Sequence, residues 1–298
     1  MSNFDIVILT DSRYINPESP NSYVQNILIE DAIVQKALEG KDLIVTRKDW
    51  ADPDFNWAST CAVLFRTTWD YFNKVNVFKK WLKNVSSKTL LINSAGIIWW
   101  NMDKKYLGEL KQRGVPIIPT HYIEKGSSST LADIHSKTGW KETVLKPTIG
   151  GSGRHTFRLK REELKAHEED FKKLIAEEDF MLQPFQKSIP EKGEWSFIIF
   201  GKTFSHAVQK KAKQGDFRVQ DDFGGTVHNY QPKQKEINFA MRAVAACPAN
   251  PAYARVDVVM DNEGELAVSE LELIEPELWF RRKPEAAELM AEEVLKHL

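Results

Sequence analysis

The sequence predicts an α/β lobe built on a parallel sheet, followed by two mixed α+β lobes. Over the first ninety or so residues, short apolar strands alternate with helical segments, which is the pattern of a parallel sheet. Further along, Gly201-Lys202 and Asn262-Glu263-Gly264 each separate two strand-like runs, as hairpin turns do. A chain of 298 residues is long enough for two or three lobes that share a cleft.

The N-terminal lobe is expected to form a sheet of short buried strands. Apolar and β-branched runs place these strands at 4–10, 43–46, 62–65 and 89–92. Between the first two, Ser22 and Gln25 form a capping-box pair that starts a helix, and Gly40 ends it. No glycine-rich turn follows the first strand, so the lobe has no dinucleotide fingerprint. We therefore expect it to bind substrate.

A polar segment follows the third predicted strand, where parallel sheets present their ligand sites. It contains Arg66, Thr67, Trp69 and Asp70. Arg66 has a fork of donors that suits a carboxylate, and Asp70 could hold an ammonium group. We predict that these four residues bind an amino-acid-like or peptide-like substrate. The sequence leaves open the alternative that Arg66 and Asp70 form a surface ion pair.

The rest of the chain mixes helices with strands. Helical patterns occupy 103–113 and 161–178 and begin again at Pro284. Strand patterns occupy 143–147, 180–183, 195–200, 203–209, 256–260 and 266–273.

Composition excludes several classes of function. The formal net charge of −1 provides no general basic field for nucleic acid. No apolar stretch approaches the length of a membrane span, and the N-terminus lacks the cationic region of a signal peptide. The two cysteines are too few for a disulfide framework or a Cys-rich zinc site. We therefore expect a cytoplasmic monomer or homodimer that binds a small molecule, and neither nucleic acid nor a membrane.

A lysine precedes a glycine-rich turn at the end of a predicted strand. Lys146 is followed by Gly150, Gly151, Ser152 and Gly153. Glycines let backbone amides close on phosphate oxygens, while Ser152 adds a hydroxyl donor and Lys146 a point charge. The segment is no Walker loop, because no Gly-Lys-Ser/Thr follows. It is a candidate phosphate site, although ordinary hairpins also contain Gly-Gly.

Three carboxylates fall on the last predicted hairpin. Glu270 and Glu272 are two apart on one strand and share a face, and Asp257 lies on the partner strand. Clustered carboxylates repel unless a cation lies among them, and oxygen ligands suit Mg²⁺. The alternative is that the glutamates mark the wet face of an antiparallel strand.

A cationic stretch precedes this hairpin. It contains Lys210, Lys211, Lys213 and Arg218 and runs into Gly224-Gly225. It is either a mobile charged loop or a clamp on a phosphoryl group, for which the arginine fork is suited.

In their order along the chain, these segments resemble the ATP-grasp superfamily. The chain looks most like its prokaryotic glutathione synthetase and peptide-ligase branch, and within that like the O-ureidoserine cyclo-ligases of cycloserine biosynthesis. The resemblance covers about residues 101–280. The segments that carry it are 100–104, 144–153, 183–185, 205–208, 215–225, 255–257 and 270–276.

The resemblance implies an ATP-grasp fold in which ATP lies between two antiparallel sheets. It places an N-terminal lobe at 1–100, a central lobe at 101–182 and a C-terminal lobe at 183–298. Lys104 and Lys146 would contact ATP phosphates, beneath the loop of Gly150, Gly151, Ser152 and Gly153. The remaining nucleotide contacts would be Gln183, Pro184 and Phe185 as the adenine hinge and Glu194, or else Glu191, at the ribose.

The resemblance also implies the chemistry. Asp257, Glu270 and Glu272 would hold Mg²⁺. Lys210 and Arg218 would face the γ-phosphate and an acyl-phosphate, and Arg255 would steady the tetrahedral intermediate. The sequence departs from the glutathione synthetase pattern at Glu272, where that branch usually has Asn, and at Glu275-Pro276, which replaces a small polar segment.

The implied activity is ATP-dependent ligation of a carboxylate to an amine through an acyl-phosphate, with release of ADP and phosphate. The product would be an amide or peptide-type bond on a small amino-acid-like substrate, including one formed by intramolecular cyclisation. The alternatives are a small-molecule kinase on the same fold and a non-catalytic nucleotide-binding regulator. A regulator does not need all three carboxylates, whereas a kinase differs in releasing ADP without an amine.

Overall fold

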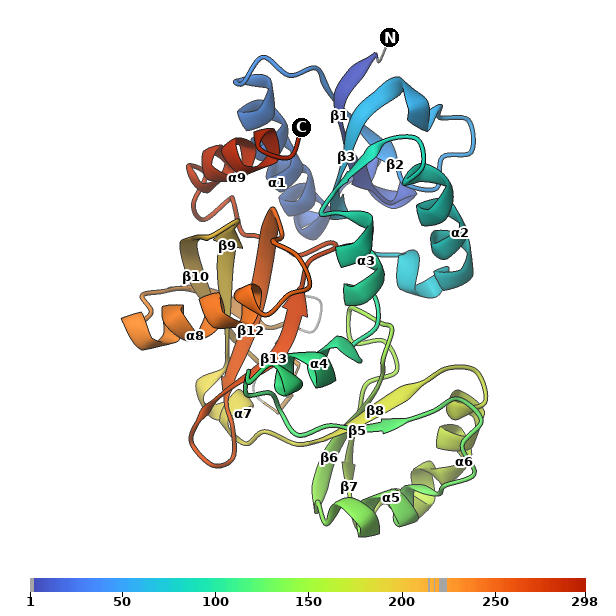
Figure 1. Cartoon of the computed structure of the whole chain (residues 1–298). Helices are drawn as coiled ribbons and strands as arrows, with labels where there is room; N and C mark the ends of the chain where they lie inside the picture. Colours follow the sequence, from blue (N-terminus) through green and yellow to red (C-terminus); the bar gives the residue numbers. More distant parts are fainter. Residues whose placement is uncertain (1–2, 214, 217, 220–223) are drawn as a thin grey trace.

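Three sheets make up the molecule in this computed structural model, which describes residues 3–213, 215–216, 218–219 and 224–298. Figure 1 shows the N-terminal sheet at the top, the C-terminal sheet in the middle and the central sheet at the bottom. The mixture of one parallel and two antiparallel sheets confirms the fold class expected from the sequence. Among the described helices, none is both long and apolar enough to cross a bilayer.

The N-terminal sheet is parallel throughout, with strand order β2-β1-β3-β4. Its strands are β1 (Phe4–Thr10), β2 (Val45–Asp49), β3 (Thr60–Thr67) and β4 (Leu90–Ile92). Helices α1 (Ser22–Glu39) and α2 (Val75–Val85) pack against it, so residues 6–9 of β1 are fully buried, as strands of parallel sheets are. Short 3₁₀ turns lie at Ser12–Tyr14, Trp57–Ser59 and Tyr71–Asn73.

Two local predictions in this lobe are wrong. The residue that caps α1 is Asn21, whose side chain accepts from the amide of Val24, so Ser22 and Gln25 form no capping box. Gln25 instead donates to the carbonyl of Pro20. The second strand begins two residues later than expected, because residues 43 and 44 lie outside the ladder that β2 forms with β1.

The central sheet is antiparallel, with strand order β5-β8-β6-β7. Its strands are β5 (His121–Ile123), β6 (Glu142–Pro147), β7 (Phe157–Lys160) and β8 (Phe180–Pro184). Helices α5 (Leu131–Thr138) and α6 (Leu164–Ile175) pack against it, with Ile134 and Phe171 in the shared core. Helices α3 (Ala95–Asn101) and α4 (Tyr106–Gln112) connect the N-terminal sheet to this one. The sequence signals for α3, α5 and β5 were too weak to predict these elements.

The C-terminal sheet is also antiparallel, with strand order β11-β10-β9-β12-β13. Its elements are α7 (Ser188–Lys192), β9 (Glu194–Phe200), β10 (Thr203–Lys211), β11 (Thr226–Tyr230), α8 (Gln234–Ala245), β12 (Tyr253–Met260) and β13 (Leu266–Glu272). The hairpins β9–β10 and β12–β13 confirm the two turn predictions. Apolar side chains of the strands pack against α8 and α4, which leaves the polar side chains on the opposite face.

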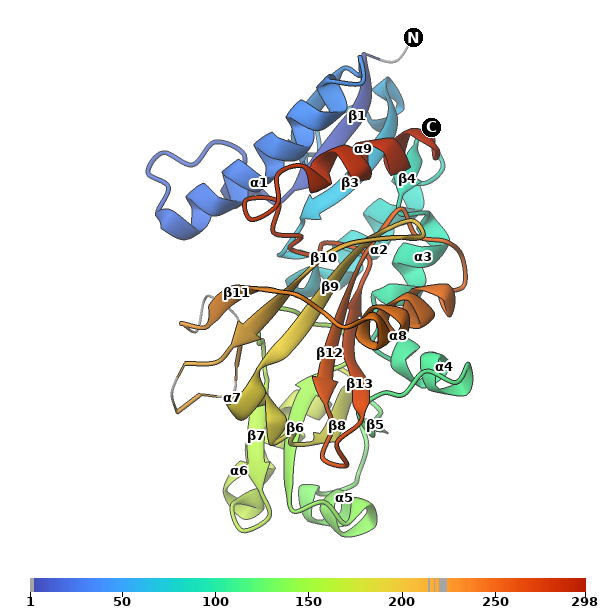
Figure 2. The same ribbon diagram turned by 90° about the vertical axis from the view of Figure 1, so that its left-hand side faces the viewer.

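The chain ends against the lobe in which it begins. Helix α9 (Ala286–Leu295) lies beside α1, as Figure 1 and Figure 2 both show, and shares a core with the N-terminal sheet. The buried hydroxyl of Tyr253 on β12 lies within hydrogen-bond distance of the carbonyl oxygens of Phe65, Ile92 and Ile274, which ties this lobe to the C-terminal sheet. The N-terminal and C-terminal sheets are therefore joined, and the central sheet faces them across a pocket.

Candidate active site

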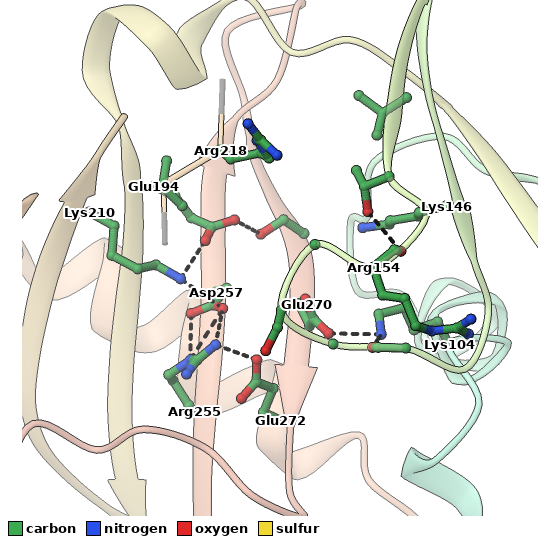
Figure 3. Close-up of a pocket in the computed structure, with 18 of the residues that line it drawn as sticks. Lys104, Lys146, Arg154, Glu194, Lys210, Arg218, Arg255, Asp257, Glu270 and Glu272 are labelled. Atoms are coloured by element: carbon green, nitrogen blue, oxygen red, sulfur yellow. Dashed lines mark hydrogen bonds and ion pairs between the residues drawn. The ribbon is translucent and has the colours of Figure 1, made fainter. Parts of the chain in front are cut away.

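A pocket of about 250 Å³ lies between the polar face of the C-terminal sheet, the end of β6 and the glycine-rich turn (Figure 3). Trp69 and Phe72 of the N-terminal lobe form one part of its wall. Many of the other lining residues are charged. They are Lys104, Lys146, Arg154, Glu194, Lys210, Arg218, Arg255, Asp257, Glu270, Glu272, Glu275 and Glu277.

The three predicted carboxylates come together on the floor of this pocket. Asp257 on β12 is opposite Glu270 on β13 in the ladder, and Glu272 follows on the same face. One oxygen from each lies within 4.8 Å of the others, which is the spacing of a shared cation site. The alternating-glutamate alternative fails, because this face of the hairpin closes a pocket instead of meeting open solvent.

Basic side chains determine the charge state of these acids. Burial alone would raise the pKa of Asp257, but Arg255 and Lys210 outweigh it and hold that pKa at about 2. Burial likewise opposes ionisation of Glu270, yet its pKa is lowered by Lys104 and Lys146. Asp257 and Glu270 are therefore anionic at neutral pH.

Arg255 connects two of the acids. Its guanidinium donates to Asp257, with Nη2 2.8 Å from Oδ2, and also to Glu272. The ring of Trp279 lies 5.3 Å from it. Burial raises the pKa of Glu272 well above its usual range, although Arg255 opposes this. Ser196 adds a hydrogen bond to Asp257 from the neighbouring strand β9.

The predicted lysines surround the same point. Lys104 Nζ lies 3.1 Å from Glu270 and donates to the carbonyl of Gly150. Lys210 Nζ lies 2.6 Å from Glu194 and 3.1 Å from Asp257. Lys146 lines the pocket from the end of β6, and burial lowers its pKa, opposed by the charge of Glu270.

The glycine-rich turn lies over the pocket and touches the N-terminal lobe. A Cβ added to Gly151 would lie 2.7 Å from the ring of Phe72, so only glycine fits this approach. Ser152 and Gly153 have φ angles of 49° and 66°, in the left-handed region. Arg154 holds the turn in place through Glu178 and through the carbonyl of Ile149.

Of the predicted hinge, Gln183 and Pro184 line the pocket and Phe185 does not. The amide of Phe185 donates to Glu142, its carbonyl accepts from Asn262, and its ring stacks under Arg158 at 3.8 Å. Its backbone groups are therefore committed to the protein, which corrects the hinge prediction at this position.

The two candidates for the ribose contact are also separated. Glu194 lines the pocket, where it pairs with Lys210 and accepts from Ser269. Glu191 lies on the exposed side of α7 and lines no part of the pocket among the described residues.

The segment after β3 differs most from expectation. Arg66 is 1% exposed and faces the interior, 4.0 Å from Glu30 and 3.8 Å from Asp31. Thr67 is buried and lies 2.6 Å from Thr10 through their hydroxyls. A substrate has no access to either, so the prediction that they bind one is wrong.

The remaining two residues of this segment have different surroundings. Asp70 accepts from Trp50 and from Lys74, with Nζ 2.6 Å away, and it does not line the pocket. The alternative of an Arg66–Asp70 surface pair is wrong too, since each has other partners. Trp69 does line the pocket, and its indole donates to the carbonyl of Glu275.

In the cationic stretch, Arg218 lines the pocket and pairs with Asp216, Nη2 to Oδ2 2.8 Å. Lys211 and Lys213 do not line the pocket. Of the predicted stretch 215–225, residues 217 and 220–223 fall outside the described part of the chain.

Comparisons with known proteins agree with this geometry. A family model described as the N-terminal domain of the D-cycloserine synthetase DcsG matches residues 6–93. The cycloserine biosynthesis protein DcsG of Streptomyces lavendulae is 30% identical over 249 residues, which cover 77% of this chain and 81% of that protein. This chain belongs to the DcsG family.

Solved structures extend the match over the whole fold. The crystal structure of D-cycloserine synthetase DcsG superposes with a TM-score of 0.85 at 26% identity, covering 98% of each chain. D-alanine–D-alanine ligase from Bacillus anthracis in complex with ATP shares the fold, with a TM-score of 0.64 at 14% identity over 99% of this chain and 97% of that one. The protein is an ATP-grasp ligase, which forms a carbon–nitrogen bond, depends on ATP and Mg²⁺ and releases ADP and phosphate.

The residues present in the DcsG-family pocket fit Mg²⁺ and ATP. The donor set of Asp257, Glu270 and Glu272 consists of oxygens, which Mg²⁺ prefers. At the other end, Gln186 lines the pocket and its Oε1 is buried with no hydrogen-bond partner among the described residues. An unpaired buried acceptor suits a ligand that donates a hydrogen bond, such as the amino group of adenine.

Sequence reasoning missed several residues of the lining. Gln186 comes three residues after Gln183 but has no motif of its own. Trp279 reaches the pocket from beyond β13, below the cations of Lys210 and Arg255. Glu275 was noticed only as a departure from a related pattern, and that departure was the one signal available for it.

Proposed function

We propose that this ligase holds Mg²⁺ and ATP between the central and C-terminal sheets. The observation that carries the proposal is the convergence of Asp257, Glu270 and Glu272 beside Lys104 and beneath the glycine-rich turn. In the proposal the three carboxylates coordinate the metal, and Lys104 and Lys146 contact phosphate oxygens. Mg²⁺ is commonly held in this manner, by a few carboxylates together with substrate phosphates.

For the nucleotide, the proposal places adenine against Gln183, Pro184 and Gln186, with Ile118 and Val144 as apolar walls. The ribose is placed at Glu194. Glu194 pairs with Lys210, which also contacts Asp257, so Glu194 lies between the adenine end and the metal site.

The chain's own groups supply charge neutralisation. Bound ATP provides the phosphoryl group that makes the substrate carboxylate reactive, as an acyl-phosphate. The positive charges of Lys210 and Arg218 stabilise the negative charge on the transferred phosphoryl group. Arg255 stabilises the oxyanion that forms when the amine attacks. The turn at Gly151, closed on Phe72, keeps water away from the reactive carboxyl group.

The proposed substrate is a small amino acid that carries a second nitrogen nucleophile, such as O-ureidoserine. This rests on the names of the DcsG relatives and on the position of Trp69, which brings the N-terminal lobe to the pocket wall. We place the reaction in the cytoplasm, where ATP is supplied, with a free small molecule as the partner.

The test is ADP release by the purified enzyme with Mg²⁺ and ATP. O-ureidoserine, single amino acids and dipeptides are offered one at a time, and the organic product is identified by mass spectrometry. We expect release to depend on a compound with both a carboxylate and a nitrogen nucleophile, and the product to carry a new carbon–nitrogen bond in place of one carboxylate C–O bond, whose oxygen leaves with the phosphate. ADP release with an amine-free carboxylate, giving a stable phosphorylated product, would contradict the proposal.

A further inference from the structure

One acidic side chain in the pocket lacks the counter-ion that the others have. Of the six acids that line it, five lie within 4.0 Å of a lysine or arginine; these are Glu194, Asp257, Glu270, Glu272 and Glu277. In the part of the chain that the structure describes, Glu275 has no such partner. Glu275 is partly buried, and a partly buried carboxylate without a counter-ion favours a cationic ligand.

The backbone around Glu275 is held rigidly. Three consecutive carbonyls accept hydrogen bonds from buried or partly buried side chains of other elements. Tyr253 donates to Ile274 at 2.9 Å, Trp69 to Glu275 itself at 2.8 Å, and Arg66 to Pro276 at 3.2 Å. Binding groups held this firmly lose little freedom when a ligand arrives.

Glu275 lies at the end of the pocket that the N-terminal lobe closes. The Tyr71 hydroxyl is a hydrogen-bonding neighbour of its carboxyl group, and Trp69 covers its backbone. Lys104 and Glu270, which pair with each other, are the charged neighbours of Glu275 on the side of the metal site. The residues proposed to contact adenine lie elsewhere, since Gln183 is on β8 of the central sheet and Gln186 is two residues beyond that strand. The position of Glu275 therefore suits the substrate and not the nucleotide.

We propose that Glu275 binds the ammonium group of the amino-acid substrate and so selects substrates with a free α-amine. This rests on the proposed function, because it assigns one contact within the same pocket. Burial raises the pKa of Glu275 to about 8, a cost that the charge of Lys104 only partly offsets. A bound ammonium group beside the carboxylate relieves that cost.

The experiment compares O-ureidoserine with its analogue that lacks the α-amine. Binding of each is measured calorimetrically in the presence of ADP and Mg²⁺, for the wild type, Glu275→Gln and Glu275→Asp. We expect the wild type to prefer the amine by about 30-fold or more, the loss typical of an unpaired buried charge. In Glu275→Gln the preference should shrink to within about threefold, while Glu275→Asp should keep part of it.

A matched control is Glu263→Gln, at the exposed turn between β12 and β13, which should retain the full preference. Unchanged ADP affinity in Glu275→Gln shows that the variant is folded. Equal binding of both compounds by the wild type, or an undiminished preference in Glu275→Gln, overturns the inference alone. A wild type that binds neither compound and releases no ADP with O-ureidoserine overturns the proposed function, and this inference with it.

Discussion

Two nearly buried arginines, Arg255 on β12 and Arg66 on β3, differ in what lies beyond their carboxylate partners. Arg255 is 8% exposed and pairs with Asp257 and Glu272 at the pocket. Arg66 is 1% exposed and lies near Glu30 and Asp31 in the closed interior. Both are cations with two acids nearby, so the pairing itself says little about function. Access to a cavity distinguishes them.

The acids of the two sites also differ in charge balance. Burial raises the pKa of Glu30 and of Asp31, and their basic neighbours do not reverse it. Asp257 shares two cations, Arg255 and Lys210, which do reverse it. The interior site also accepts backbone amides of the C-terminal segment, since Glu30 binds those of Phe280 and Arg281. It joins α1 to that segment, whereas the pocket site keeps charge available for a ligand.

The largest effect is expected for Asp257→Asn. It removes a charge from the proposed metal site while the side chain keeps its shape. Turnover should fall by about 10²–10³-fold or more, a loss typical of removing one electrostatic stabiliser. Initial rates of ADP release measure it. They are taken at a temperature at which urea unfolding shows the variant to be folded, because Arg255 and Lys210 each lose a buried partner. Near-normal turnover would place the metal elsewhere.

Arg66→Met should act on stability instead. It leaves Glu30 and Asp31 without one of their cations, and breaking a buried charge network in this way costs about 3–5 kcal/mol. Urea unfolding measures the loss. The affinity for an ATP analogue should stay close to that of the wild type at low temperature. An unchanged free energy of unfolding would show that Arg66 does not stabilise the fold, and the contrast with Arg255 would then be wrong.

The sequence predicted the metal-site residues correctly because they lie close together in the chain, on the two strands of one hairpin. Glu270 and Glu272 share a face because strand side chains alternate, and a short hairpin brings Asp257 opposite them. Arg66 could not be assigned in the same way. Its partners are Glu30 and Asp31 on a helix and Pro276, 210 residues further on. Only tertiary packing decides that its side chain faces inward.

A partly buried titratable group outside the pocket is His206, which lies on β10, the strand that also carries Lys210. Burial lowers the pKa of His206 to about 4, and the ring contacts the Leu278 carbonyl. Between about pH 6.5 and pH 4 the unfolded chain binds a proton here that the folded chain does not. The free energy of unfolding should therefore decrease as the pH is lowered from about 6.5 to about 4, by up to ~3 kcal/mol. His206→Gln should flatten that part of the pH profile of unfolding. Identical profiles for the wild type and the variant would contradict a lowered pKa of His206.

Lys146→Ala and Arg218→Ala should separate two roles within the pocket. Loss of Lys146 should raise the KM for ATP by about tenfold, because its charge is proposed to serve phosphate binding. Loss of Arg218 should lower kcat more than it raises that KM, because its charge is proposed to act on the transferred group. Steady-state kinetics with ATP as the varied substrate distinguish them. Equal effects on both parameters in both variants would count against the division.

The smallest effect is expected at Glu191, which served above as the other candidate for the ribose. Because Glu191 lies outside the pocket, Glu191→Gln should leave the KM for ATP unchanged within about twofold, whereas Glu194→Gln should raise it several-fold. A raised KM in Glu191→Gln would mean that α7 takes part in nucleotide binding.

The most direct measurement is the Mg²⁺ dependence of ATP-analogue binding in two variants that each neutralise a buried aspartate paired with arginine. Calorimetric titration with a non-hydrolysable ATP analogue, with and without Mg²⁺, is carried out at low temperature on the wild type, Asp257→Asn and Asp31→Asn. Mg²⁺ should tighten binding in the wild type and in Asp31→Asn, and should have little effect in Asp257→Asn. A metal dependence lost in folded Asp31→Asn, or retained in full in Asp257→Asn, would contradict the assignment of the pocket as the Mg²⁺-ATP site.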